Sequence, residues 1–157
     1  MTEPKQKPHR SKQNYATPKE FLAAVEKRFG HLGFDLAAEP ETCAANPGCF
    51  FSKDDNALSQ DWSEINDGRF CWLNPPFGNI ARFAEKCAIE SEKGVRILML
   101  VPASVGSNWF RDHVLGKAMV FGLNPRMSFD GVAMYPKDLM LCVYANGVHG
   151  FSQWRWK

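Results

Sequence analysis

Trp72-Leu73-Asn74-Pro75-Pro76-Phe77 joins an apolar run to a rigid polar turn and is the most informative part of this sequence. The run from Arg69 to Leu73 predicts a buried strand. The two prolines end it, because each fixes φ at about −65° and removes a backbone N–H donor. A residue before proline is also kept out of helical geometry. The sequence therefore predicts a stiff loop at the carboxyl end of a strand.

The side chains of this loop suit a planar amine. The carboxamide oxygen of Asn74 and the backbone carbonyl of Pro75 can both accept hydrogen bonds, and an –NH2 group offers two donors. Pro76 stiffens the turn, and Phe77 supplies a flat face for a heterocycle, where stacking contributes about 1–3 kcal/mol per base in nucleic-acid sites. The loop thus predicts a site for an exocyclic amine.

Helical patterns flank the loop on both sides. Thr17-Pro18 predicts a helix start, with Thr17 as the cap, and Gly30 ends that helix. Apolar residues between Ile80 and Ser91 fall on one helical face, and Gly94 closes this second helix. A short third helix is predicted over 107–115 from its Ser cap and apolar spacing.

Strand patterns alternate with these helices. We expect strands at 34–37, 69–73, 95–101, 118–121, 126–129 and 139–144, and a loop with little regular structure over 39–56. This alternation predicts an α/β fold with a mostly parallel sheet and an antiparallel edge. Ligands of such sheets bind at the carboxyl ends of the strands, where Asp35 and Asn74 fall.

Length and charge predict one domain with a basic tail. The chain has 157 residues and a formal net charge of +2. Residues 17–157 are expected to form a single domain, and residues 1–16 a disordered tail. Two interpretations of this tail stay open, contact with nucleic-acid phosphates and a solvated terminus. Its basic residues are Lys5, Lys7, Arg10 and Lys12.

Composition argues against several classes of protein. No apolar stretch reaches the roughly 18 residues of a membrane span, and the polar N-terminus lacks a signal-peptide pattern, so we expect a cytoplasmic protein without a membrane partner. The cysteines have no Cys-x-x-Cys spacing and no histidines arranged as ligands, so we expect no metal site and reduced thiols. They are Cys43, Cys49, Cys71, Cys87 and Cys142.

Five blocks together resemble the compact phage-type DNA N6-adenine methyltransferase (Dam-like) family, from about Thr17 to Phe129. They are Thr17-Pro18 with Phe21, Phe34-Asp35-Leu36-Ala37-Ala38, Asp55 to Leu58 with Trp62, Trp72 to Phe77, and Leu100-Val101-Pro102-Ala103. The resemblance implies a Rossmann-like, S-adenosylmethionine-dependent fold. It implies methyl transfer to a flipped-out adenine in double-stranded DNA, in the cytoplasm of a bacterial host, by a phage or prophage protein. Asn74, Pro75, Pro76 and Phe77 would be the catalytic residues.

The resemblance also implies cofactor residues. Thr17 would lie over the methionine carboxylate, and Asp35 with Ala37 would line the amino-acid or ribose end. Glu39 and Asp55 compete for the ribose diol or the adenine. The Gly-x-Gly turn common after the first strand of methyltransferases is missing here. A separate alternative for Asp35, that it is a strand-end cap, also stays open.

Other functions remain open as well. Arg126 resembles a basic residue that could meet DNA, or it is an exposed strand-end arginine. The same Asn-Pro-Pro-aromatic loop suits an RNA adenine or protein glutamine methyltransferase. A non-catalytic nucleic-acid-binding protein that kept the fold is a further alternative. The sequence predicts no oligomeric state.

Overall fold

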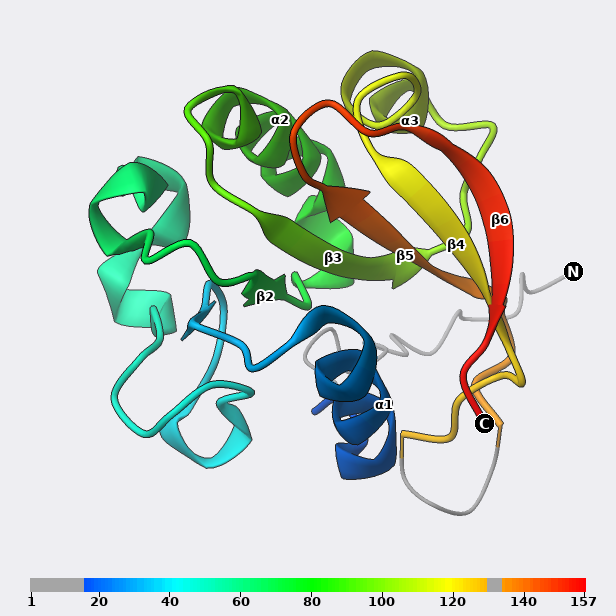
Figure 1. The fold of residues 1–157 in the computed structure, drawn as a ribbon, viewed down its shortest axis with the longest axis horizontal. Helices are drawn as coiled ribbons and strands as arrows, with labels where there is room; N and C mark the ends of the chain where they lie inside the picture. Colours follow the sequence, from blue (N-terminus) through cyan, green and yellow to red (C-terminus); the bar gives the residue numbers. More distant parts are fainter. Residues whose placement is uncertain (1–15, 130–133) are drawn as a thin grey trace, which may run out of the picture.

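The computed structural model describes residues 16–129 and 134–157, whose strands form one six-stranded sheet (Figure 1). β1, β2 and β3 are parallel to one another, β5 is antiparallel to its neighbours β3 and β4, and β6 is parallel to β4. The strands in spatial order are β1 (Phe34–Asp35), β2 (Cys71–Leu73), β3 (Ile97–Pro102), β5 (Leu139–Tyr144), β4 (Met119–Asn124) and β6 (Gly150–Arg155).

The sheet is mixed and mostly parallel, and the prediction of an α/β fold is confirmed. The predicted antiparallel edge is wrong, because the antiparallel strand β5 lies inside the sheet between β3 and β4. Every residue of β5 is buried, which suits an interior position with covered faces on both sides. Its apolar sequence reports burial and carries no information on strand direction.

Helices cover both faces of the sheet. α2 (Ile80–Glu92) and α3 (Asn108–His113) pack on one face, against side chains such as Ile97 and Met99 of β3. α1 (Lys19–Phe29) packs on the other face, where Phe21 and Val25 meet Leu98. Alternate residues of β3 therefore enter two separate cores, as the pleat of a strand requires. No helix among the described residues is long and apolar enough to cross a membrane.

The long connection from β1 to β2 contains only short 3-10 turns, as the predicted loop requires. A single bridge between Asp35 and Phe50 adds one extended contact. Trp62 anchors the segment, because its buried indole Nε1 donates to the Ala57 carbonyl at 2.8 Å. The turns are Pro40–Thr42, Lys53–Asp55, Ala57–Ser59 and Trp62–Ile65.

Two local predictions are wrong. Thr17 does not cap α1, because Pro18 occupies the N-cap position and no side chain there makes a capping hydrogen bond. The strand predicted at 126–129 is absent, and those residues form an irregular segment in which Met127 is buried. The edge strand β6 was not predicted, and it is mostly exposed along its length.

Candidate active site at the ends of β1 and β2

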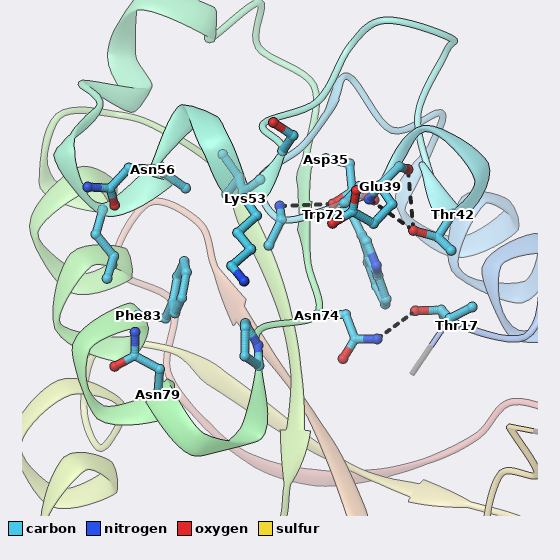
Figure 2. A pocket seen from close by; sticks show the side chains of 18 residues that line it. Thr17, Asp35, Glu39, Thr42, Lys53, Asn56, Trp72, Asn74, Asn79 and Phe83 are labelled. Atoms are coloured by element: carbon cyan, nitrogen blue, oxygen red, sulfur yellow. Dashed lines mark hydrogen bonds between the residues drawn. The ribbon is translucent and has the colours of Figure 1, made fainter. Parts of the chain in front are cut away.

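A cavity of about 440 Å³ lies where β1 and β2 end (Figure 2). It brings together residues that are far apart in the sequence and were predicted as site residues. Those that line it are Thr17, Asp35, Ala37, Glu39, Asn74 and Pro76.

Asn74 follows β2 directly and reaches across to the segment before α1. Its carboxamide Nδ2 donates to Thr17 Oγ1 at 3.2 Å. Figure 2 shows the carboxamide oxygen turned to the side opposite Thr17. The donor end of this side chain is therefore held by a neighbour, and its acceptor end points elsewhere in the site.

Asp35 is almost fully buried at the end of β1, with 2% of its surface exposed. Its Oδ1 accepts from the Ala37 backbone N–H at 3.1 Å, and its Oδ2 from the Ala44 N–H at 2.9 Å. Burial raises the pKa of this carboxyl to about 6, although the two amide donors oppose the shift. The contacts of a strand-end cap are thus present in a residue that also lines the cavity.

Glu39 and Asp55 were alternatives in the sequence, and the structure separates them. Glu39 lines the cavity, and its backbone N–H donates to Thr42 Oγ1 at 3.1 Å. Asp55 is outside the lining, and its Oδ2 accepts from the backbone N–H and the hydroxyl of Ser52 at 2.7 and 3.0 Å. Asp55 therefore shapes the turn whose other residues, Lys53 and Asn56, reach the cavity.

Phe77 and Pro75 are part of the loop but not of the cavity wall. Pro75 is buried. Phe77 is partly buried, with its ring centroid 6.0 Å from that of Tyr135. Tyr135 lies in turn 5.4 Å from Phe129. The aromatic residue of the loop thus faces the segment between β4 and β5.

Several lining residues were not predicted. Asn79 and Phe83 follow the loop and line the cavity. The sequence did not identify Phe83 as a site residue, because its helical spacing is typical of a core residue. Lys53 extends its amino group into the cavity (Figure 2), on a turn that the sequence presents as an ordinary polar loop. Trp72 lines the cavity although only 1% of its surface is exposed.

The predicted nucleic-acid contacts are placed only in part. Arg126 is half-exposed, and its guanidinium Nε donates to Asp138 Oδ1 at 2.9 Å, so it is ion-paired. Lys5, Lys7, Arg10 and Lys12 lie outside the described residues. Over residues 16–129 and 134–157, no cluster of three His, Cys, Asp or Glu side chains could hold a metal ion.

The fold and site define an α/β protein with a ligand-sized cavity at the ends of parallel strands, beside an Asn-Pro-Pro-Phe loop. Residues 5–139 match the family described as DNA N-6-adenine-methyltransferase (Dam). The chain belongs to this family, which confirms the resemblance found in the sequence.

Two similar proteins from phages carry the name DNA N-6-adenine-methyltransferase. The protein of Escherichia phage T1 is 32% identical over 98 residues, which cover 62% of this chain and 39% of that protein. The protein of Haemophilus phage HP1 (strain HP1c1) is 30% identical over 121 residues, covering 73% of this chain and 65% of that protein. The matched regions thus span less than two thirds of either relative.

Proposed function

We propose that this protein transfers a methyl group from S-adenosylmethionine to the N6 amine of adenine in DNA. The observation that carries the proposal is the placement of Asn74 directly after β2 and in the wall of a 440 Å³ cavity, with its carboxamide Nδ2 held by Thr17. Membership of the Dam family and the names of both phage relatives support the same reaction.

The residues around the cavity fit S-adenosylmethionine. The volume of the cavity lies within the range of about 300–1,000 Å³ that is typical of small-molecule sites. Phe83 and Leu58 offer apolar surface for a purine, while Glu39 offers a carboxylate that can accept two hydrogen bonds from a ribose diol. The sheet has one antiparallel strand, β5, between the parallel strands β3 and β4, and this arrangement is compatible with a Rossmann-like methyltransferase fold.

Each predicted cofactor residue has a proposed part. Glu39 is the better candidate for the ribose diol, because the carboxylate of Asp55 is engaged by Ser52. Asp35 and Ala37 line the amino-acid or ribose end, with Asp35 also holding the backbone at Ala44. When bound, the cofactor supplies an activated methyl group on its sulfonium.

The residues of the loop position the nucleophile. The oxygen of Asn74 and the carbonyl of Pro75 would accept hydrogen bonds from the two N6 hydrogens and favour the pyramidal nitrogen that develops as the methyl transfers. As the bond from N6 to the methyl group forms, the bond from the methyl group to the sulfonium breaks, the demethylated cofactor leaves, and N6 releases one proton to water. Phe77 would contact the face of the base, and Pro76 would keep the turn rigid. Since proximity and orientation dominate such a reaction, no covalent enzyme intermediate is needed.

The DNA has to present its adenine outside the helix. A stacked base cannot enter a cavity, so an adenine of double-stranded DNA would flip out of the duplex. We infer that Lys5, Lys7, Arg10 and Lys12 contact phosphates, and that Arg126 does so when it exchanges Asp138 for DNA. We also infer that the protein acts in the cytoplasm of a bacterial host, from a phage or prophage gene.

A labelling experiment tests the function. The folded protein is incubated with methyl-labelled S-adenosylmethionine and, in separate reactions, adenine-containing duplex DNA, RNA or a glutamine peptide. The DNA is then digested to nucleosides. We expect label in N6-methyladenine. Label in RNA or in a glutamine peptide, but not in DNA, would redirect the proposal to those substrates. Binding of DNA with no transfer to any substrate would favour a non-catalytic protein.

A further inference from the structure

The hydroxyl of Thr17 has an unexpected partner. A threonine before a helix start commonly caps the helix, yet α1 has no side-chain cap. Thr17 Oγ1 instead accepts from the carboxamide Nδ2 of Asn74, 57 positions away, at 3.2 Å. Both residues line the cavity (Figure 2).

This contact bears on a choice that the loop alone does not make. A carboxamide has an acceptor end and a donor end, and a rotation of about 180° of its terminal torsion exchanges them with little change in shape. Pro75 restricts the backbone of Asn74 but leaves that rotation open. An amine substrate offers donors, so an –NH2 group turned toward it would set donor against donor.

We propose that Thr17 is a positioning residue that orients the Asn74 carboxamide with its oxygen toward the target amine. The inference rests on the proposed function of Asn74. As a hydroxyl, Thr17 accepts from Nδ2 and keeps its own proton to donate elsewhere. It can therefore hold Asn74 and also donate to a carboxylate of the cofactor, so a separate readout is needed for each role.

Two substitutions of Thr17 separate orientation from packing. Thr17→Val keeps the branched shape and removes the acceptor, whereas Thr17→Ser keeps the hydroxyl. We expect Thr17→Val to lower kcat roughly tenfold at saturating DNA and cofactor, the size expected for loss of a neutral hydrogen bond. The Kd for cofactor should change less than about threefold in Thr17→Val. Thr17→Ser should retain most of the wild-type kcat. Ser63→Ala is the control, since its hydroxyl donates to Asp61 Oδ1 at 2.6 Å, outside the cavity lining.

A spectroscopic measurement keeps this test independent of turnover. In the protein without cofactor, the side-chain amide protons of Asn74, assigned with Asn74→Ala, should show contacts to Thr17 in NMR spectra. These signals should shift in Thr17→Val and return in Thr17→Ser. If they are absent, or if kcat of Thr17→Val equals that of the wild type, the positioning role is wrong. A rise in cofactor Kd with unchanged kcat would assign Thr17 to the cofactor alone. An inactive wild type that shows the NMR contacts would refute the proposed function and leave the contact established.

Discussion

At the residue scale, the carboxamide oxygen of Asn74 is one of the two acceptors that we propose for the target amine. Asn74→Ala deletes it while both prolines and Phe77 remain to hold the loop. Fold and cofactor affinity should survive. We expect turnover to fall about 10²–10³-fold, the usual effect of removing a preorganised polar contact in a transition state. The measurement is kcat for formation of N6-methyladenine in DNA.

The neighbouring aromatic residue gives the comparison. Phe77 packs against Tyr135 rather than in the cavity wall, so Phe77→Ala should act mainly through weaker capture of the flipped base. We expect a larger rise in KM for DNA than fall in kcat. If Asn74→Ala retained nearly wild-type turnover, or if both variants changed the same constant equally, the roles assigned within the loop would be wrong.

Asp35 predicts a pH dependence of stability. Its folded pKa of about 6 lies above the ordinary value of 3.8, so the folded state binds the proton more tightly than the unfolded state. The stabilisation from this proton is complete below about pH 4 and is lost as pH rises through 6. Between pH 4 and 7 the loss should be roughly 2 kcal/mol. Denaturant unfolding of wild type and Asp35→Asn at each pH measures it, because asparagine does not titrate.

The exposed Asp54 supplies the control for this experiment. Asp54→Asn should leave the pH profile of the wild type in place. If Asp35→Asn also followed the wild-type profile between pH 4 and 7, the source of the dependence would lie in other groups. Asp35 holds the loop after β1 by accepting hydrogen bonds from the N–H groups of Ala37 and Ala44. The cofactor affinity of Asp35→Asn, measured in parallel, would report how far these contacts shape the cavity.

At the element scale, α2 ends on a buried charge. Glu90 has no exposed surface, and its Oε1 lies 2.9 Å from Lys86 Nζ and 3.1 Å from Lys93 Nζ. Lys93 Nζ also lies 3.4 Å from Asp61 Oδ1, and this ion pair ties the end of α2 to the long loop between β1 and β2. Glu90→Gln removes the charge while keeping the shape. We expect a loss of about 1–3 kcal/mol in the free energy of unfolding, as for hydrogen bonds to charged groups.

Glu85 lies on the exposed side of the same helix and provides the matched substitution. Glu85→Gln should change stability by less than about 0.5 kcal/mol, as most surface changes do. Urea unfolding of both variants gives the two values. Equal small effects would mean that the lysines around Glu90 are satisfied by water instead.

Helices and strands with a clear apolar pattern in their own sequence were predictable. Elements that depend on pairing with a neighbouring strand were not. The apolar run of β3 and the helical period of α2 report burial directly, and both are present where expected. β6 is exposed except for the buried Trp154 and the half-buried Gly150, so its sequence has no continuous apolar pattern that would predict a strand. The backbone pairing with β4 makes this segment a strand. At 126–129, Met127 is buried as a strand residue would be, but its carbonyl accepts a hydrogen bond from the backbone N–H of Tyr135 at 2.6 Å in an irregular segment outside the sheet.

At the scale of the whole molecule, the site is assembled by contacts between distant segments. The placement of Asn74, Pro76 and Asp35 at the cavity could be predicted, because strand ends in α/β sheets converge on ligands. The hydrogen bond from Asn74 to Thr17 and that from Ala44 to Asp35 could not, since each joins segments whose distance is set by the folded chain. The strand order that places β5 inside the sheet is likewise a property of the whole fold.

The final prediction concerns the whole protein on DNA. Deleting residues 1–12 removes Lys5, Lys7, Arg10 and Lys12, and each phosphate contact contributes a slope of about −0.9 to the dependence of log affinity on log salt concentration. The deletion should therefore weaken DNA binding at low salt and make the slope less steep by up to about 3–4. Cofactor affinity should not change, because the lining residues in the described part of the chain all lie at or after Ala16.

Fluorescence anisotropy with labelled duplex DNA at several salt concentrations measures this slope. A variant with the four basic residues changed to glutamine provides the control for length, since it keeps the tail and removes only its charge. Because counterion release depends on charge and not on chain length, this variant should reproduce the deletion. If both variants bound with the wild-type slope, the tail would be a solvated terminus, and the phosphate contacts would have to come from residues elsewhere in the chain, such as Arg126.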